Sequence, residues 1–319
     1  MKRIIYTLSV AIMAMACEKE EAFIGPSSCD QFCEFRVSEV LSHNQNDGVD
    51  FTNESVEFSA KFNNTANWKI IVEGQESGAI KTFSGSGRTI DPSITKWDGK
   101  ADGKWFTEED CNVSLVVDDY PDTISSSLTI MNKYDYDGIG TVINSFKNLL
   151  GVNAYGGVTT DQSIDIDGNG SFHMEGTETG GLWWMGGMAL SPPGSYFTIP
   201  TTSPDQLYFN MYVYGTGSAT TKLTVTFLED ENEDGTFDKA TEDGWEKPTI
   251  IDWIGWKLIS FPMSETTEMF ENGHGNGNET KELDKIKMIE VQLFSNGTAD
   301  PTPKALNVDY AVFTENGPL

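Results

Sequence analysis

The most specific chemical pattern in the sequence is the acidic segment at residues 230–238. Oxygen-bearing side chains recur there at alternate positions, and Gly235 stands sixth, where a calcium-binding loop needs a sharp turn. The twelve-residue calcium loop would place Glu at position 241, but the chain has Thr241, followed by Glu242 and Asp243. A structural Ca²⁺ ion is therefore predicted in a different kind of loop, and a solvated acidic turn is the alternative. The predicted ligands are Asp230, Asn232, Asp234, the carbonyl of Thr236, and Asp238 directly or through water.

Several tryptophans lie in surroundings that favour ligand binding. Pyranose rings present apolar C–H faces that stack on flat aromatic side chains, while polar groups bind the hydroxyls. Glycine pairs flank Trp183-Trp184, and because neighbouring strand residues point to opposite faces, we expect one of these indoles to pack and the other to be exposed. Packing in the core is the alternative for each candidate. The predicted ligand-binding residues are Trp183, Trp184, Trp245 after the acidic segment, and Trp253 in a stretch flanked by Gly and Asp.

Motifs of the common catalytic sites are missing. The sequence has no His-Glu-x-x-His, no Gly-x-Ser-x-Gly and no phosphate-binding glycine loop, and its 3 histidines are scattered. A glycosidase needs two placed carboxylates. With 49 acidic residues, the sequence neither supports nor excludes such a pair. We therefore predict a protein that is not an enzyme.

The charge balance restricts the partners. The chain has 319 residues, of which 49 are acidic and 21 basic, and its formal net charge is −28. Nucleic acids and anionic lipids are disfavoured because their binding requires a cationic surface. Polyanionic sugars are disfavoured as well, unless a metal ion bridges the charges. Neutral ligands and cations remain, and 8 Trp, 10 Tyr and 18 Phe can build cores and stacking surfaces.

The first residues have the pattern of a secretion signal. Lys2 and Arg3 precede a mostly apolar stretch at residues 4–16, which is too short to span a bilayer as a helix. The junction before Cys17 resembles a lipobox, which implies a signal peptide at residues 1–16, lipidation of Cys17 and a lipid-anchored tether at residues 17–33. An ordinary signal peptide is the alternative. The acidic run directly after Cys17 resembles the export tag of Bacteroidetes surface lipoproteins.

Three cysteines remain after Cys17. Cys29 and Cys33 are close enough in the sequence to pair, which would leave Cys111 buried and free. Alternatively, one of them joins Cys111, since an exported protein can form disulfides. A zinc site is not expected, because no histidine is near these thiols in the sequence.

Short segments of alternating polarity predict an all-β chain with two domains. Residues 34–119 are expected to form a small β-sandwich, and residues 120–133, which contain Pro and Ser, a linker. Residues 134–319 are expected to form a larger β-sandwich, a jelly roll that opens with a strand at residues 134–138. The strongest strand patterns of the two domains are at residues 56–62, 68–73, 113–117, 206–214, 222–228, 256–261, 286–294 and 308–313.

Two sequence pieces add family resemblances. Trp97-Asp98-Gly99 before a final strand resembles immunoglobulin-like domains of flagellar hook-capping proteins and PKD-like modules, which implies that Trp97 packs and that Asp98-Gly99 forms a turn. Residues 134–138, 255–262 and 308–310 resemble pieces of carbohydrate-binding domains with a jelly-roll fold.

The order of lipobox, PKD-like module and carbohydrate-binding-like jelly roll resembles the surface glycan-binding lipoproteins of Bacteroidetes polysaccharide-utilization loci. The resemblance implies a protein on the cell surface at the outer membrane, in contact with the membrane only through its lipid. Its ligand would be a neutral polysaccharide or oligosaccharide, with a β-glucan as first choice, and an outer-membrane transport complex would be a further partner. Two alternatives are a jelly-roll glycanase or lyase, and a structural or adhesive surface protein.

Overall fold

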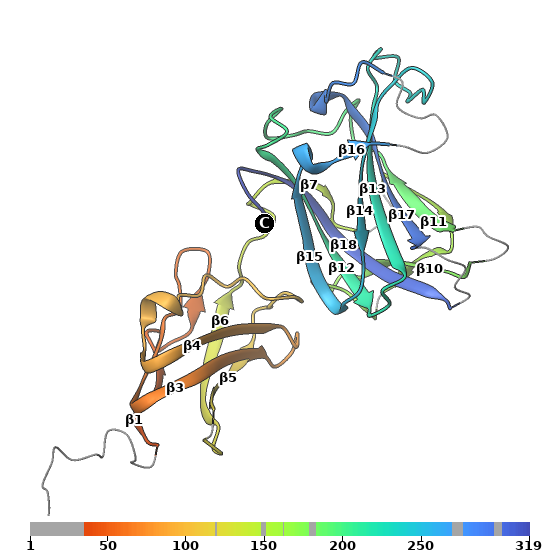
Figure 1. Cartoon of the computed structure of the whole chain (residues 1–319). Helices are drawn as coiled ribbons and strands as arrows, with labels where there is room; N and C mark the ends of the chain where they lie inside the picture. The colour runs from red at the N-terminus through yellow and green to blue at the C-terminus, as the bar shows by residue number, and fades with distance from the viewer. Residues whose placement is uncertain are drawn as a thin grey trace, which may run out of the picture.

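The chain forms two all-β domains, which follow one another in Figure 1. The computed structural model describes residues 35–118, 120–147, 151–161, 163–178, 183–269, 277–296 and 302–319. The predicted all-β class is confirmed. The predicted signal peptide and tether, residues 1–33, lie outside the described residues. Within the described ranges, no helix has the length and apolar character needed to cross a membrane.

One long strand organises the first domain. β3 (Phe58–Gly74) pairs near its start with β1 (Val37–His43), toward its end with β5 (Asp110–Val117), and along both parts with β4 (Ile80–Ile90). It contains the run at 68–73 and residues 58–62 of the run at 56–62, and its register with β4 shifts between them. Alternate residues of this strand are buried and form much of the domain's core.

The predicted linker at residues 120–133 is wrong. Most of it is β6 (Ile124–Asn132), which pairs antiparallel with β5, so the sheet continues to Asn132 and the domain boundary follows it. Leu128 and Ile130 are buried, and the serines between the apolar positions leave one face of the strand polar. β2 (Val49–Asp50) pairs with β6 in parallel.

Trp97 packs in the core of the first domain, as predicted. It is 1% exposed, and its indole N–H donates to the carbonyl of Lys100 at 2.8 Å. The rings of Phe51 and Phe106 lie 4.6 and 5.0 Å from its ring. Gly99 has φ +99°, so the predicted turn uses the conformation that glycine favours.

Cys111 on β5 is buried and free. Cys29 and Cys33 lie outside the described residues. Burial, together with the charges of Glu109 and Asp110, raises the pKa of the Cys111 thiol to about 12. We expect iodoacetamide to leave Cys111 unlabelled in the native protein and to label it after unfolding, because the reactive thiolate is suppressed. Peptide mass spectrometry measures this, and labelling of Cys111 in the native protein would contradict the burial.

Two six-stranded sheets face each other in the second domain. One sheet has the order β15-β12-β18-β10-β9 with β7 also beside β18, and the other has the order β16-β14-β13-β17-β11-β8. The first sheet contains β15 (Ile254–Pro262), β12 (Leu207–Thr216), β18 (Lys304–Glu315), β10 (Ser171–Gly176), β9 (Val158–Asp161) and β7 (Thr141–Asn144). The second contains β16 (Thr267–Glu268), β14 (Gly244–Ile250), β13 (Thr221–Glu229), β17 (Ile286–Ser295), β11 (Trp184–Leu190) and β8 (Val152–Gly156).

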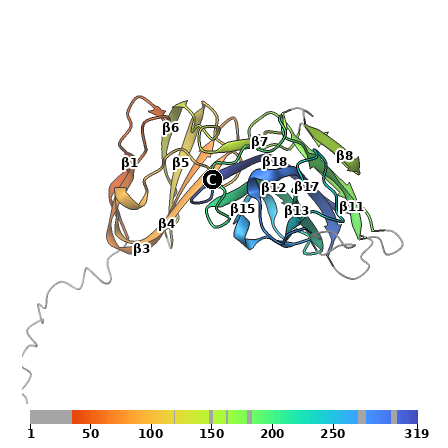
Figure 2. The same ribbon diagram turned by 90° about the horizontal axis from the view of Figure 1, so that it is seen from above.

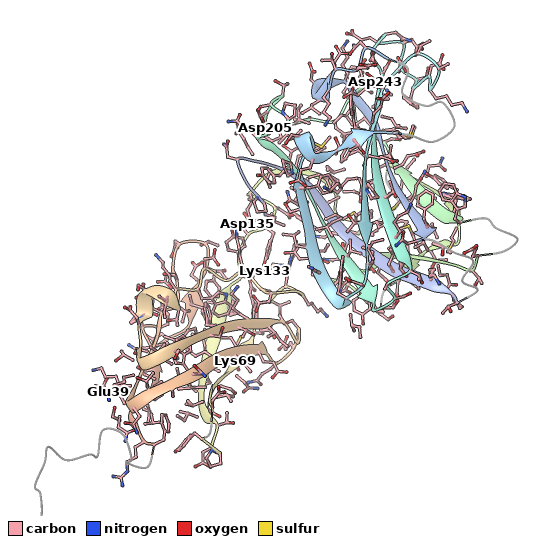
Figure 3. All side chains as sticks on the ribbon, in the orientation of Figure 1. Glu39, Lys69, Lys133, Asp135, Asp205 and Asp243 are labelled. Atoms are coloured by element: carbon pink, nitrogen blue, oxygen red, sulfur yellow. The ribbon has the colours of Figure 1, made fainter. Side chains whose placement is uncertain are left out.

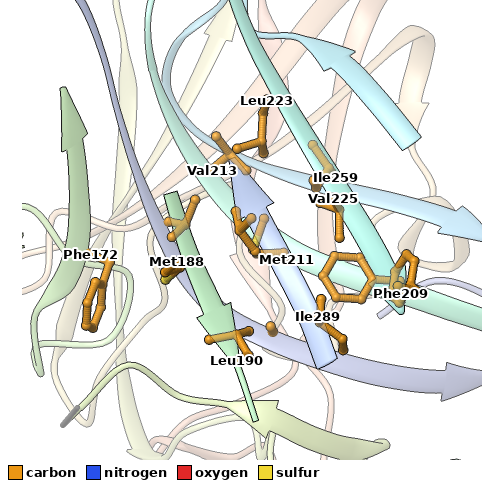
Figure 4. Close-up of a cluster of buried hydrophobic side chains, with 14 of the residues drawn as sticks. Phe172, Met188, Leu190, Phe209, Met211, Val213, Leu223, Val225, Ile259 and Ile289 are labelled. Carbon is orange, nitrogen blue, oxygen red and sulfur yellow. The ribbon is translucent and has the colours of Figure 1, made fainter. Parts of the chain in front are cut away.

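The core of this domain lies between the two sheets. Figure 4 shows Phe209 and Met211 of β12 together with Val225 of β13 and Ile289 of β17. Because side chains alternate along a strand, the other residues of β13 and β17 must face outward on the far side of their sheet. The expected strands at 206–214, 222–228, 256–261, 286–294 and 308–313 are confirmed as β12, β13, β15, β17 and β18.

The two domains meet through an aromatic cluster, and Figure 2 shows them side by side from above. Trp105, in the loop before β5, is 5% exposed and stacks on Tyr136 at 3.8 Å with an angle of 3° between the rings. Tyr310 of β18 and Tyr212 of β12 meet the same indole edge-on, at 4.7 and 5.7 Å. The cluster therefore occupies part of the outer face of the β12–β18 sheet.

The segment at residues 134–138, expected to be an opening strand, forms a bend and a turn instead. The Asp135 carboxylate accepts hydrogen bonds from the backbone N–H groups of Asp137 and Gly138, which is typical of a turn. Tyr136 of this segment is part of the aromatic cluster between the domains, and Tyr134 packs against it.

Candidate functional site

A groove crosses the outer face of the sheet that contains β13 and β17. Its volume is about 540 Å³. Strands β13, β14, β17 and the residue before β11 line it, together with the acidic segment and Met269. The lining residues are Trp183, Lys222, Thr224, Thr226, Leu228, Phe237, Asp238, Lys239, Glu246, Pro248, Met269, Glu290, Gln292 and Phe294.

The floor of the groove is polar because of cross-strand pairing. Thr226 on β13 pairs with Glu246 of β14 on one side and with Glu290 of β17 on the other. Two residues earlier on β13, in the next cross-strand row of the same face, Thr224 pairs with Gln292 of β17. The amide of Gln292 donates to Oε2 of Glu290 at 2.7 Å, which holds both side chains in place. The groove thus presents hydroxyl, amide and carboxylate groups in two adjacent rows.

One end of the groove is aromatic. Lys222 pairs with Phe294 in the third row, and its ammonium lies 4.8 Å from the Phe294 ring and 5.7 Å from the Trp183 ring. Trp183 stacks on Phe294 at 5.4 Å, and both rings line the groove. Trp184 is not a lining residue and stacks on Tyr155 of β8 at 5.8 Å. The two indoles are 41% and 42% exposed. Both are therefore available for stacking, contrary to the expectation that one of them packs in the core.

The chain geometry explains this departure from alternation. The register between β11 and β17 shifts between Trp184 and Gly186, and Gly186 has φ +146°. The next residue, Gly187, pairs with Tyr155 on one side and with Gln292 on the other, and a Cβ there would lie only 2.6 Å from the Val291 carbonyl oxygen and 3.1 Å from Gln292. Burial, together with the nearby Glu290 charge, raises the pKa of Tyr155 to about 12. Burial also raises the pKa of Glu290.

The other two predicted tryptophans lie away from the groove. Trp245 is 7% exposed, and the Lys281 ammonium lies 4.8 Å from its ring. Its neighbour Glu246 lines the groove, so alternation along β14 directs the Trp245 indole to the opposite side. Trp253 packs against the main core, and its indole N–H donates to the carbonyl of Val213 at 3.2 Å. The structure does not bring these two indoles to Trp183 and Trp184.

The acidic segment at residues 230–238 is part of the loop that connects β13 to β14. Residues 237–239 of this loop form a wall of the groove. Asp230 is buried and accepts hydrogen bonds from the backbone N–H groups of Asp234 and Gly235. The other predicted ligands are nearer to solvent: Asn232 Oδ1 accepts from the Asp234 N–H, Asp234 Oδ1 from Thr236, and Asp238 Oδ1 from the Ala240 N–H. Gly235 has φ +94°, as the sharp turn requires.

Two acidic residues that the sequence did not single out are buried at the base of this segment. Glu242 is fully buried, and its carboxylate accepts from the backbone N–H groups of Asn232 and Asp238, joining both ends of the loop. Glu229, at the end of β13, is also fully buried, and burial raises its pKa to about 8. The sequence signal for Glu242 was its position: it is one residue after Thr241, where the twelve-residue calcium loop would have its glutamate.

No protein-family model and no curated protein matches the chain. Among solved structures, the family 11 carbohydrate-binding module of cellulase Lic26A-Cel5E of Clostridium thermocellum is 14% identical with a TM-score of 0.40, covering 56% of this chain and 96% of that one. The family 11 module of Clostridium thermocellum with a β-1,3-1,4-mixed-linked tetrasaccharide is 16% identical with a TM-score of 0.39, covering 56% and 97%. SGBP-B from a complex xyloglucan utilization locus in Bacteroides uniformis is 10% identical with a TM-score of 0.38, covering 88% and 73%.

Proposed function

We propose that this chain binds a neutral polysaccharide in the groove over β13 and β17 without hydrolysing it. The observation that carries the proposal is the joining of the exposed Trp183 indole and a polar floor in one open groove, with a second exposed indole, Trp184, at the next position in the chain. Sugar rings need flat aromatic faces for their C–H patches and hydrogen-bonding groups for their hydroxyls. The groove volume of about 540 Å³ is within the usual range of ligand sites, roughly 300–1,000 Å³.

Charge favours a neutral ligand. The groove contains cationic Lys222 and Lys239 as well as anionic Asp238, Glu246 and Glu290, so neither sign dominates it. The formal net charge of −28 repels polyanions approaching from solution. The other face of the sandwich is less suited to a ligand, because the first domain packs on part of it.

The cellular setting is a further part of the proposal and comes from the N-terminal sequence. Lipidation at Cys17 would anchor the protein at the outer membrane on the cell surface, where extracellular polysaccharides are available. Within this setting, a β-glucan is the first ligand to test, and an outer-membrane transport complex is the proposed recipient of the captured glycan. A structural Ca²⁺ ion at residues 230–238 would stiffen the wall of the groove.

Affinity electrophoresis against a panel of neutral and anionic polysaccharides tests the proposal. We expect the migration of the protein to be retarded by at least one neutral polymer and not by the anionic ones. A reducing-end assay on the same mixtures should show no cleavage. Binding to none of the neutral polymers would favour the structural or adhesive alternative. Cleavage that Glu246→Gln or Glu290→Gln abolishes would instead identify a glycanase.

Gln292→Ala is expected to weaken glycan binding about 5-fold, the equivalent of about 1 kcal/mol for one hydrogen-bonding group. The side chain lies on the groove floor and also orients Glu290. Isothermal titration calorimetry with the polymer identified in the panel measures the change. Gln206→Ala is the matched control, because Gln206 is exposed and lies outside the groove. An equal loss in both variants would show that Gln292 has no specific role.

A further inference from the structure

A compact group of carboxylates lies at the base of the acidic segment. Glu229, Glu231 and Asp243 each place a carboxylate oxygen within 4.8 Å of those of the other two. Glu229 ends β13 and Asp243 directly precedes β14, and the Glu229 N–H donates to the Asp243 carbonyl at 3.1 Å. Figure 3 shows Asp243 at the end of the second domain that lies away from the first domain.

Backbone N–H groups hold all three carboxylates in place. Glu229 Oε1 accepts from the Glu282 N–H at 2.9 Å, and Glu231 Oε1 accepts from the Asp243 N–H at 2.8 Å. The two oxygens of Asp243 accept from the N–H groups of Gly277 and Glu279, at 2.9 and 2.6 Å. These donors fix the positions of the carboxylate oxygens before a cation binds.

One oxygen of the group is left without a partner. Glu229 is fully buried, and its Oε2 makes no hydrogen bond. The indole of Trp245 favours the charged form of Glu229, but its Nε1 does not reach hydrogen-bond geometry and is itself without a partner. A buried carboxylate oxygen beside two other carboxylates is unfavourable unless a proton or a cation joins them.

The nearby lysines are engaged elsewhere. Lys281 donates to the carbonyls of Met263 and Thr266, both at 2.8 Å. Lys285 donates to the Glu231 carbonyl and forms ion pairs with Glu282 and Glu233 at 3.1 and 3.5 Å. In the part of the chain that the structure describes, no basic side chain forms an ion pair with Glu229, Glu231 or Asp243.

We propose that Glu229, Glu231 and Asp243 form a binding site for a hard divalent cation, with Ca²⁺ as the first candidate. Three carboxylates supply only oxygen ligands, which Ca²⁺ prefers and which suit softer metals poorly. This ligand set is separate from the one predicted at residues 230–238. The cation would join β13, β14 and the segment that begins at Gly277. If the groove binds glycan as proposed, the same cation would also fix the wall at residues 237–239.

Calorimetric titration of the chelator-treated chain with CaCl₂ tests the site, with thermal unfolding as a second measurement. We expect the unmodified chain to bind Ca²⁺ and to melt at a higher temperature when it is bound. Glu229→Gln should weaken one site by at least about 10-fold, because it removes a charged ligand. In chelator, this variant should melt no lower than the unmodified chain, because its amide has no buried charge to accommodate.

Two further variants separate the possible sites. Asp234→Ala removes a predicted ligand of residues 230–238 and should leave the Glu229 site intact. Glu233→Gln removes the same charge from an exposed position of the same hairpin and should change neither measurement. If Glu229→Gln does not fold, Glu231→Gln takes its place, because Glu231 is less buried. The proposal is overturned if the unmodified chain binds no Ca²⁺, or if the folded variant keeps every site at unchanged affinity. Neither result depends on glycan binding.

Discussion

The double variant Trp183→Ala/Trp184→Ala is expected to bind the glycan at least about 30-fold more weakly than the unmodified chain. Burying one stacking indole against a ligand contributes about 1–3 kcal/mol, so two contribute about 2–6 kcal/mol. Each indole also stacks on a second ring, Phe294 for Trp183 and Tyr155 for Trp184, so the double variant loses the Trp183–Phe294 pair that lines the groove and the Trp184–Tyr155 pair beside it. The variant should still fold, because the two indoles are 41% and 42% exposed and neither is part of the buried core.

Calorimetry of the double variant and of both single variants measures this loss. Trp256→Ala is the matched control, because Trp256 is a partly buried indole on β15, in the opposite sheet, and pairs edge-on with Tyr214. Circular dichroism and melting curves show whether each variant is folded. Unchanged affinity in a folded double variant would place the glycan outside this groove.

The strands of the second domain were predictable because their alternation is regular. In β13, Leu223, Val225 and Phe227 enter the core and the threonines between them face the groove, so the pattern follows directly from a sheet with one buried face. What the pattern does not state is which strands become neighbours. Glu290 reaches the groove because β17 pairs with β13 so that Thr226 lies opposite Glu290, and this register depends on residues far apart in the chain.

The binding candidates show the same limit. Local composition selected Trp183 and Trp184 because glycines surround them, and Gly187 does lie between Tyr155 and Gln292 where a side chain would not fit. The same criterion selected Trp245, which is next to the acidic segment in the sequence but points to the other side of its strand. Its neighbour Glu246 was the informative residue, since a carboxylate in a strand is expected to face away from the core.

The linker prediction failed for a related reason. Serine clusters are typical of flexible connectors, but on β6 they occupy the polar positions of an edge region whose apolar positions, Leu128 and Ile130, remain in the core. Two apolar residues at alternate positions predict a strand only weakly, in comparison with the many alternating positions of a long strand such as β3. The long-range pairing with β5 was therefore needed to define the element.

Trp105→Ala is expected to separate the two domains and to turn one cooperative unfolding transition into two. The indole is 5% exposed and is the central ring of the aromatic cluster, in contact with Tyr136, Tyr212 and Tyr310. Replacing a buried tryptophan by alanine costs about 3–5 kcal/mol when the surroundings cannot close the cavity. Here the lost free energy destabilises the contact between the domains. Trp105 is in a loop of the first domain, whereas Tyr212 and Tyr310 are on strands of the second domain.

Polar contacts between the domains would remain in this variant. The backbone N–H of Trp105 donates to the Ile166 carbonyl at 2.9 Å, and the Lys104 ammonium lies 3.7 Å from the Asp165 carboxylate. Neither contact buries apolar surface. Differential scanning calorimetry should resolve two transitions, and small-angle X-ray scattering should show a larger radius of gyration. Trp105→Phe, which keeps an aromatic ring in the cluster, should remain close to the unmodified chain in both measurements. A single unchanged transition and an unchanged radius in Trp105→Ala would mean that the covalent connection after Asn132 and the remaining contacts hold the domains in place without this indole.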